Sequence, residues 1–340
     1  MLSFFTGAGA SKPFGYSTTD TFSLRVQDHL SKVLSGHVQG DKPPHRYYPR
    51  YFFDARNFLE ELHRSADIEV ILRELNDLKR ALEKLRTQRT REMKWKDVFL
   101  KGLMETVDSD LSDLDFLLRD IHKLVYDEYW QAESDKNATK IYDDLFSSLA
   151  KSQEIMNIFT TNYDLTIERA FMDKEPDAFT DGFAYDAARR NVYWDISHYD
   201  KQARLYKLHG SVNWKRTANG EIYRVPTHDF TKHEDHVILY PGFKGVAEDE
   251  PFAFMHERLR ETLMRSRAGL FIGFAFRDEY INEIIVAALK SKPQLELIVW
   301  NPCPPDVRFH RDRVILFKEL FGERSTIGKL TEVLHKRKIL

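Results

Sequence analysis

The chain has 340 residues, of which 42% are hydrophobic and 13% aromatic, enough for a substantial buried core. Its formal net charge of −2 gives no overall basic field, so we expect no direct nucleic-acid binding. Cys303 is the only cysteine, which excludes both an internal disulfide framework and a zinc site of four thiolates.

The sequence shows no sign of a membrane or secretory segment. No apolar run approaches the roughly 18 residues that span a bilayer, and no basic stretch precedes a long apolar core at the N-terminus. Internal repeats, low-complexity tracts and Pro/Ser-rich linkers are also missing from the sequence. We therefore expect a compact cytoplasmic protein without membrane contact.

Short apolar runs, rich in β-branched or aromatic residues, predict a series of buried parallel strands. Helical patterns lie between several of these runs, for example from Asp278 to Leu289. This alternation is typical of an α/β fold with a Rossmann-like, mostly parallel sheet. The runs are Leu2 to Thr6, Ile155 to Thr161, Leu205 to Leu208, Val237 to Tyr240, Leu270 to Gly273, Leu297 to Trp300 and Val314 to Phe317.

Two stretches interrupt the alternation. From Phe53 to Ala150 there is no convincing strand, and strong helical periodicity predicts a large α-helical insertion. We expect residues 53–150 to form this insertion subdomain, and residues 1–52 and 151–340 to form the sheet domain. The second stretch, Lys215 to Asp235, is polar and should be a loop or a small β excursion.

The helical stretch carries an apolar stripe and a basic run. The stripe should pack on its own chain, which we favour over a seam with another subunit. The basic residues alternate with acidic ones, so a solvated helix face explains them better than a nucleic-acid contact does. The stripe is Ile68, Ile71, Leu75, Leu78, Leu82 and Leu85, and the basic run is Lys79, Arg80, Lys84, Arg86, Arg89 and Arg91.

A turn of small residues, Gly7-Ala8-Gly9, follows the first predicted strand and precedes a helix start. Small side chains leave backbone N–H groups uncovered, and a helix N-terminus favours negative charge, so the turn can accept a pyrophosphate. Ser11 would add a hydroxyl donor. Lys12 stands where the third glycine of a G-x-G-x-x-G pattern would be, so a tight turn without a ligand stays open as an alternative.

Polar residues follow the next two predicted strands at the point where each strand ends. Asn162 and Asp164 come directly after one strand, and His209 and Gly210 follow the other. Ligands of α/β sheets bind at this edge, where a histidine can take a proton and an asparagine can hold a hydroxyl or a water. Gly210 should leave room for a ligand. Alternatively, Asp164 caps a helix and His209 is structural.

Four segments occur in an order and rough spacing that is specific as a set. Together they resemble the sirtuin-like NAD-binding family, whose members carry Gly-Ala-Gly-x-Ser, Thr-Gln-Asn-x-Asp and Leu-His-Gly segments. The resemblance covers about residues 1–20 and 153–318, and it implies that the sheet domain binds NAD. The segments are Gly7-Ala8-Gly9-Ala10-Ser11, Thr161-Asn162-Tyr163-Asp164, Lys207-Leu208-His209-Gly210-Ser211 and Gly273-Phe274-Ala275-Phe276-Arg277-Asp278.

The resemblance also implies roles for individual residues. His209 would be the general base, and Asn162 and Asp164 would contact the nicotinamide-ribose side. Asn301 would lie near the adenosine ribose. The implied catalytic residues are Asn162 and His209, and the implied NAD contacts are Gly7, Ala8, Gly9, Ser11, Thr161, Asp164, Gly273, Phe274 and Asn301.

Two departures separate the chain from deacetylating sirtuins. Those enzymes follow the glycine loop with Gly-Ile-Pro-Asp-Phe-Arg, whereas Gly15 is followed here by Tyr16-Ser17-Thr18-Thr19-Asp20. They also carry a zinc ribbon of four cysteines, which this chain cannot build. A metal site made of histidines alone is disfavoured, because no thiolate is available for it. The histidines in question are His228, His233, His236 and His256.

What remains resembles the bacterial sirtuin-like proteins of antiphage defence, which hydrolyse NAD. Segments of the Gly-Phe-Ser-Phe type followed by Arg-Asp are usual in that group, and Gly273 to Asp278 is similar, with Ala275 in place of Ser. The resemblance implies an NAD glycohydrolase that releases nicotinamide and ADP-ribose, with NAD as substrate and no metal. A module that senses NAD or ADP-ribose without turnover, and a protein-lysine deacylase, stay open as alternatives.

Partners follow from the same resemblance. Relatives of this kind form oligomers, so a homo-oligomer is expected, with a HerA-type ATPase as a further possible partner. The helical insertion is the natural candidate for the surface through which assembly controls the enzyme.

Overall fold

The computed structural model describes residues 1–34, 68–89, 114–115, 117–130, 135–150, 155–226, 236–239, 249–303, 311–322 and 324–339. The chain divides into two compact units, and each is described by itself. The larger unit consists of Met1–Thr18 and Tyr126–Leu340, and the smaller unit is Thr19–Val125.

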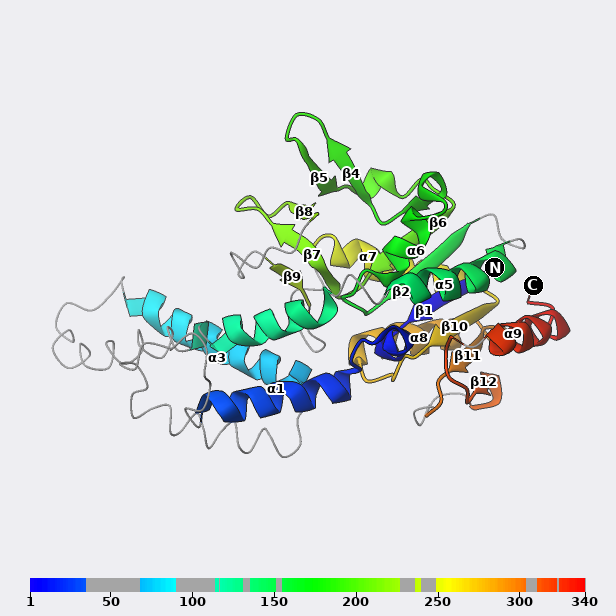
Figure 1. Ribbon diagram of the computed structural model, residues 1–340, viewed down its shortest axis with the longest axis horizontal. Helices are drawn as coiled ribbons and strands as arrows, with labels where there is room; N and C mark the ends of the chain where they lie inside the picture. Colours follow the sequence, from blue (N-terminus) through cyan, green and yellow to red (C-terminus); the bar gives the residue numbers. More distant parts are fainter. Residues whose placement is uncertain are drawn as a thin grey trace. The chain divides into compact units, whose positions relative to one another are not determined.

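The larger unit is built on a seven-stranded sheet in the order β12-β11-β10-β1-β2-β6-β3, and all its neighbouring strands are parallel (Figure 1). The Rossmann-like, mostly parallel sheet is therefore confirmed. Every predicted run except Val237 to Tyr240 supplies one of its strands. The strands are β1 (Leu2–Thr6), β2 (Met156–Thr160), β3 (Phe179–Thr180), β6 (Ala203–Lys207), β10 (Ala268–Ile272), β11 (Glu296–Trp300) and β12 (Val314–Phe317).

One row of paired residues crosses the sheet, and each member of the row is the last residue of its strand. Thr6, in the middle, pairs with Thr160 on one side and Ile272 on the other. The loops that follow the strands therefore begin side by side along one edge, the edge at which parallel α/β sheets bind ligands. The complete row is Phe317, Trp300, Ile272, Thr6, Thr160 and Lys207.

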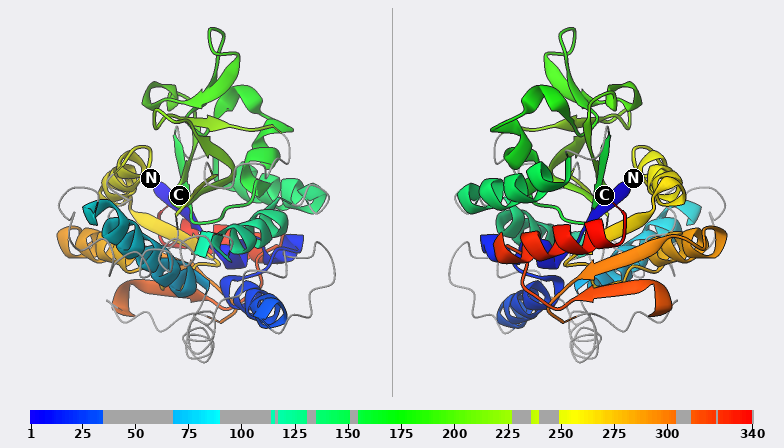
Figure 2. Two further views of the ribbon diagram at one scale, coloured as in Figure 1. Left: turned by 90° about the vertical axis from the view of Figure 1, so that its left-hand side faces the viewer. Right: turned by 90° about the vertical axis from the view of Figure 1, so that its right-hand side faces the viewer.

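Helices cover both faces of this sheet, as expected for a sheet whose strands are buried on both sides (Figure 2). Successive residues of β1 point to opposite faces: the Phe4 ring packs on Phe146 of α5 at 5.8 Å, while Phe5 joins the core formed with α7 and α8. One face carries α5 (Asp135–Ala150), α6 (Thr166–Met172) and α9 (Arg324–Lys336), and the other carries α7 (Phe252–Arg265) and α8 (Glu279–Ser291). Short 3₁₀ helices are η1 (Ala8–Ala10), η2 (Lys12–Phe14), η3 (Pro176–Ala178), η4 (Ile196–His198) and η6 (Arg311–Arg313).

A second sheet in this unit is antiparallel, with the order β4-β5-β8-β7-β9. The prediction that Val237 to Tyr240 is a parallel strand was wrong. The chain turns straight from β6 into β7 without the crossover that a parallel neighbour requires, and β9 then pairs antiparallel with β7. The strands are β4 (Phe183–Asp186), β5 (Asn191–Trp194), β7 (Gly210–Arg216), β8 (Ile222–Arg224) and β9 (His236–Ile238). The stretch from Lys215 thus contains a β excursion, and its residues 227–235 lie outside the described residues.

The smaller unit contains α1 (Thr19–Leu34), α3 (Ile68–Arg89) and helical residues 117–125. Its limits differ from the expected insertion, residues 53–150, because α1 packs against α3 while α5 packs against α6 and α9. The described part of the predicted stripe on α3 is buried only in part. Leu72 and Leu75 are buried, whereas Leu78 is 43% exposed. The side chains of Ile68, Ile71 and Leu85 lie outside the described residues.

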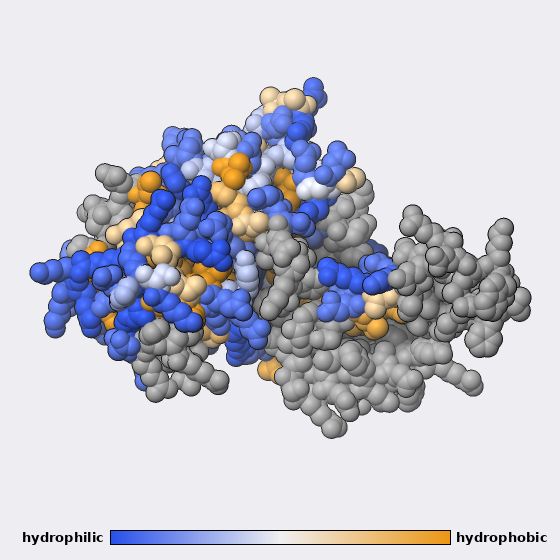
Figure 3. All heavy atoms as spheres, turned by 180° about the vertical axis from the view of Figure 1, so that it is seen from behind, coloured by the Kyte–Doolittle hydropathy of each residue, from blue (hydrophilic) through white to orange (hydrophobic). Residues whose placement is uncertain are grey.

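The described surface of the larger unit is mostly hydrophilic on the face drawn in Figure 3, with small hydrophobic areas between the polar residues. Among the described residues, no helix combines the length and the apolar character that crossing a membrane requires.

Two glycines are required where chain segments meet. Gly273 has a φ of 62°, and a Cβ there would overlap the backbone of Gly9 and Ala10. Gly210 has a φ of 79°, and its Cβ would overlap the carbonyl oxygen of Val237. The expectation that Gly210 leaves room for a ligand was wrong, because the space beside it is filled by β9.

We predict that Gly273→Ala destabilises the protein by about 3 kcal/mol or more, since it adds backbone overlap to left-handed strain. Gly220→Ala is the matched control: its φ is 87° but nothing lies within 4 Å of the new Cβ. It should lose only about 1–2 kcal/mol. Urea denaturation of both variants measures the difference, and equal losses would contradict the close approach at Gly273.

Candidate active site

The residues singled out in the sequence lie just beyond the row that ends the strands. Asn162 and His209 each stand two positions past paired residues, Thr160 and Lys207, on the neighbouring strands β2 and β6. Neighbouring strands lie roughly 4.8 Å apart, so these turns share one edge of the sheet. The same edge receives Gly7 to Ser11 after β1, Gly273 and Phe274 after β10, and Asn301 after β11.

The side chain of Asn162 is buried, and only one end of its amide group is satisfied. Nδ2 donates to the carbonyl oxygen of Gly7 at 3.1 Å and to Oγ of Ser11 at 2.9 Å. A carbonyl oxygen can only accept, so this contact identifies the nitrogen end of the amide. Oδ1 has no hydrogen-bond partner among the described residues. Because Asn162 is only 7% exposed, bulk water does not readily satisfy this oxygen. Such an unmet acceptor costs about 1–3 kcal/mol, which a water or hydroxyl donor would recover.

The carboxylate of Asp164 joins the glycine loop to the start of α6. Oδ2 accepts from Oγ of Ser11 at 2.7 Å. Oδ1 accepts from the backbone N–H of Thr166 at 3.0 Å and from its hydroxyl at 2.6 Å. Because Ser11 donates to Asp164, it accepts from Asn162. Asp164 therefore binds the first turn of α6, as a capping residue would, and also orients Asn162 through Ser11.

A buried ion pair supports the turn that holds Asn162. Lys207, 1% exposed, donates to Oε1 of Glu168 at 2.8 Å and to the carbonyl oxygens of Tyr163 and Asp164. Burial raises the pKa of Glu168, an effect that the charge of Lys207 opposes. The ammonium group thus anchors both carbonyls of the turn from within the sheet.

His209 is paired with a carboxylate that is itself anchored to a helix. Its Nε2 lies 2.8 Å from Oδ2 of Asp278, and both side chains are buried. Asp278 is the N-cap of α8, where Oδ1 accepts from the N–H of Ile281 at 2.9 Å. Burial alone would raise the pKa of Asp278, but the hydrogen bond and charge of His209 together with the helix N–H lower it below its ordinary value.

A second histidine, His256 of α7, lies close to this pair. Its Nδ1 donates to the carbonyl oxygen of Phe252 at 2.8 Å, and its ring meets Tyr280 edge to face at 5.0 Å. Burial, with a smaller contribution from His209, lowers the pKa of His256 from 6.5 to about 4. His256 is therefore neutral at physiological pH and adds no positive charge beside His209.

The glycine loop offers fewer open N–H groups than its sequence suggests. Gly7 donates to the carbonyl oxygen of Ile272 and Gly9 to that of Gly273, at 2.9 and 3.0 Å. Within the loop, Ala10 donates to Gly7 and Ser11 donates to Ala8. Of the five N–H groups from Gly7 to Ser11, only that of Ala8 has no acceptor among the described residues.

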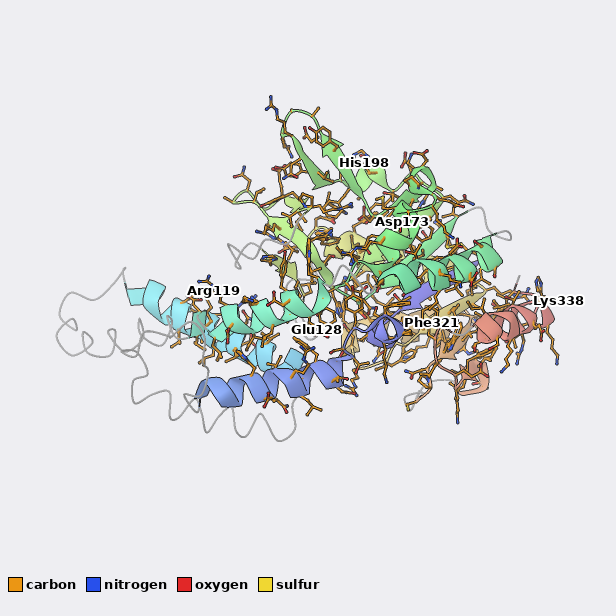
Figure 4. The ribbon with its side chains drawn as sticks, viewed as in Figure 1. Arg119, Glu128, Asp173, His198, Phe321 and Lys338 are labelled. Atoms are coloured by element: carbon orange, nitrogen blue, oxygen red, sulfur yellow. The ribbon has the colours of Figure 1, made fainter. Side chains whose placement is uncertain are left out.

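The expected helix start after this loop was also wrong, because two three-residue 3₁₀ turns, η1 and η2, follow β1. Such short turns supply little of the aligned dipole that an α-helix would. The segment beyond them is held by Glu128, labelled in Figure 4, whose Oε1 accepts from the N–H of Ser17 at 2.9 Å. The hydroxyl of Tyr129 donates to the carbonyl oxygen of the same serine.

Three further predicted contacts occupy the same edge with different degrees of exposure. Phe274 is 5% exposed and its ring packs on Phe5 at 4.6 Å, so only its backbone faces the edge. Asn301 donates through Nδ2 to the carbonyl oxygen of Phe274 at 3.4 Å and accepts the N–H of Cys303. Thr161 is half-buried and donates its N–H to Thr6.

The histidines considered as metal ligands are not gathered in the described part of the chain. His236 packs on Tyr126 at 4.9 Å, and His256 is engaged with Phe252. Among the residues that the structure describes, no group of three or more His, Cys, Asp or Glu side chains is placed to hold a metal ion. His228 and His233 lie outside that part.

Sequence reasoning did not assign a role to Asp278, Lys207 or Glu168. A signal existed for the first, because Asp278 follows a predicted strand and begins a predicted helix. Lys207 is a charged residue at the end of an apolar strand, a position at which a buried charge needs a partner. The partner itself, Glu168, lies 39 positions away in the sequence, and only the folded chain identifies it.

We predict that Lys207→Met lowers the free energy of unfolding by about 3–5 kcal/mol, because it leaves Glu168 buried without its cation. Lys174→Met is the control, since Lys174 is 45% exposed in its ion pair with Asp143 and should change stability by less than about 1 kcal/mol. Urea denaturation at neutral pH compares them. Similar losses in the two variants would refute the anchoring role of Lys207.

We also predict an acid-sensitive stability from His256. Between pH 6.5 and 4 the unfolded chain binds a proton at this residue and the folded chain does not, so stability falls as the pH falls. With a pKa of about 4 instead of 6.5, the loss is about 3 kcal/mol. His256→Gln should remove this part of the pH dependence, whereas replacing the exposed His335 by Gln should not. The measurement is the free energy of unfolding of both proteins at several pH values between 7 and 4. If it falls equally in wild type and in His256→Gln, His256 is not the source of the acid sensitivity.

Comparison with known proteins identifies the domain. Residues 156–318 match the SIR2-like domain family. No curated protein matches the chain in sequence. Among solved structures, a Sir2 homologue in complex with NAD is 13% identical, with a TM-score of 0.45 over 100% of this chain and 90% of that chain. A variant Sir2 homologue in complex with ADP-ribose is 12% identical, with a TM-score of 0.45 over 100% of this chain and 93% of that chain.

The family match covers β2 to β12 and therefore includes the turns that carry Asn162, His209 and Asp278. It is this match, rather than the distant structural likenesses, that identifies the domain. Residues 156–318 are therefore a SIR2-like domain.

Proposed function

We propose that the chain binds NAD at the carboxyl edge of its parallel sheet and hydrolyses the nicotinamide-ribose bond, which releases nicotinamide and ADP-ribose. The unmet, buried Oδ1 of Asn162 is the observation that carries the proposal. It is an acceptor prepared for a hydroxyl or a water, at the edge where His209 is paired with a carboxylate. The match of residues 156–318 to the SIR2-like domain family supports NAD as the substrate.

The chemistry matches these residues. Cleavage of the nicotinamide-ribose bond passes through an oxocarbenium-like state, so the enzyme must position groups and compensate charge more than supply a strong nucleophile. Asn162 would hold the water or a ribose hydroxyl through Oδ1. His209 would take the proton that the water or hydroxyl loses as it attacks.

The remaining residues would either contact NAD or hold the loops of the site in place. The Ala8 N–H, Thr161 and Asn301 lie along the same edge and would contact NAD, together with the backbone of Gly273 and Phe274. Gly7, Gly9, Ser11 and Asp164 would act mainly by shaping the loop and orienting Asn162, because their polar groups already have protein partners. No metal enters the proposed reaction.

We further propose that the biological role is antiphage defence through NAD depletion. The similarity of Gly273 to Asp278 to the segment of defence-associated sirtuin-like proteins supports this role. Uncontrolled NAD hydrolysis would harm the host, so activity would depend on assembly into a homo-oligomer or on a HerA-type ATPase. Cellular NAD measured during phage infection tests the role, which requires a fall in cells carrying the chain and none in cells carrying the Asn162→Ala variant.

We predict that Asn162→Ala lowers nicotinamide release by about 100-fold or more, because the attacking group loses its acceptor. The assay is chromatographic measurement of nicotinamide and ADP-ribose after incubation with NAD. Asn191→Ala, in the hairpin between β4 and β5, is the matched control and should retain the wild-type rate. His209→Ala should lower nicotinamide release as strongly as Asn162→Ala does.

Two outcomes would overturn the proposal. An Asn162→Ala protein that consumes NAD at the wild-type rate would remove the assigned mechanism. Tight NAD binding by wild type without any nicotinamide release, alone and with its assembly partner, would replace the hydrolase by a sensing module.

A further inference from the structure

Each oxygen of the Asp278 carboxylate has its own partner, and one of these partners is the ring of His209. Oδ1 of Asp278 is occupied by the N–H of Ile281, and Oδ2 faces Nε2 of His209 at 2.8 Å. Only 5% of His209 and 7% of Asp278 are exposed, so water competes little for this contact. The helix end thus aims one carboxylate oxygen at one ring nitrogen.

The backbone before Asp278 is held in an unusual conformation. Phe276 has a φ of 54°, the left-handed region that non-glycine residues rarely adopt. The carbonyl oxygen of Phe276 accepts from Nδ2 of Asn282 at 2.7 Å, which ties the turn to α8. A bulky side chain kept in this region indicates that the surrounding structure determines the path of the chain into Asp278.

The protonation of the pair follows from the donors that surround the carboxylate. A helix N–H and an imidazole both favour the ionised form of Asp278, and an ionised carboxylate only accepts hydrogen bonds. The ring nitrogen that faces it must therefore carry a proton. A neutral imidazole has one proton, so the other nitrogen, Nδ1, keeps its lone pair.

We propose that Asp278 is a positioning residue that holds His209 in the tautomer protonated on Nε2, so that Nδ1 is the atom that accepts the proton during NAD cleavage. The catalytic part of this proposal rests on the proposed function, whereas the tautomer does not. After the transfer the ring is an imidazolium, and Asp278 stabilises its charge while the proton on Nε2 stays in place.

The other titratable groups near the pair leave this assignment intact. His256 from α7 is neutral and donates its own proton to Phe252, and Arg260 acts electrostatically on His256. Tyr163, from the turn after β2, meets the ring of His209 at 6.4 Å between centroids. Tyr280 of α8 contacts His256. Asp278 is the partner that bonds to the ring of His209.

A purely structural role for Asp278 as the cap of α8 is the competing explanation, and Asp278→Asn separates the two. Asparagine caps helices about as well as aspartate, so α8 should keep its cap through Oδ1. The amide nitrogen would then face His209 and donate to Nε2, which moves the ring proton to Nδ1. Asp195 supplies the control, because it caps η4 in the same way and is exposed.

The experiment is nitrogen NMR of full-length protein labelled with ¹⁵N-histidine, at about pH 8, where imidazole is ordinarily neutral. The His209 signal is assigned by its loss in His209→Gln. We expect a protonated Nε2 in wild type and Asp195→Asn, and a protonated Nδ1 in Asp278→Asn. An unchanged tautomer in a folded Asp278→Asn protein, or a protonated Nδ1 in wild type, would overturn the proposal.

Activity adds a second readout. Asp278→Asn should lower nicotinamide release by about 100-fold or more with little change in the melting temperature, and Asp195→Asn should leave it unchanged. If Asp278→Asn does not fold, Asp278→Ser, which also caps helices, replaces it; there the tautomer signal should become a mixture. If the tautomer shifts in Asp278→Asn but the wild-type protein never turns over NAD, the proposed function is refuted and the positioning role of Asp278 stands. A normal rate with a shifted tautomer would refute Nδ1 as the base.

Discussion

The parallel register of the seven-stranded sheet is the constraint on which the rest of the structure depends. Because all neighbouring strands are parallel and six of them end in one row, from Phe317 to Lys207, every loop with a candidate function begins at the same edge. A slip of one residue between two strands would turn their side chains to opposite faces. Register and site are therefore established together.

At that edge, a chain of hydrogen bonds fixes the positions of the polar side chains. Asp164 accepts from Ser11, Ser11 accepts from Asn162, and Asn162 donates also to Gly7. Lys207 anchors the same turn from within the sheet. The one acceptor left over, Oδ1 of Asn162, is thus unmet in a network that is otherwise complete. A buried polar group left unmet calls for an explanation, and the proposed function supplies one in a water or a ribose hydroxyl that would donate to it.

The glycine loops have a structural explanation that does not depend on any ligand. A Cβ on Gly7 would lie 2.7 Å from Cα of Phe274, and one on Gly9 would lie 2.8 Å from Cα of Gly273. Small residues after β1 are required because two loops at the centre of the sheet are in backbone contact. The N–H groups of Gly7 and Gly9 donate to Ile272 and Gly273, so neither of these two glycines offers a free backbone donor at this edge.

The sequence by itself determined the fold class, six of the seven strands of the large sheet and the placement of Asn162, Asp164 and His209 at strand ends, but not the two-residue strand β3. Apolar runs and their order suffice for this, because a buried strand must be apolar throughout and parallel strands share one carboxyl edge. It could not determine that β9 belongs to an antiparallel sheet, or that Leu72 rather than Leu78 of α3 is buried. A short apolar run fits either kind of sheet, and the buried arc of a helix depends on its partner.

The tertiary structure alone decided which groups meet. The bond from Ser11 to Asp164 joins residues 153 positions apart, and the bond from His209 to Asp278 joins residues 69 positions apart. Neither pairing has a local sequence signal, because each depends on how two loops approach across the end of a sheet. The availability of the Ala8 N–H and of Asn162 Oδ1 was decided in the same way: whether a polar group is free depends on every neighbour that could have used it.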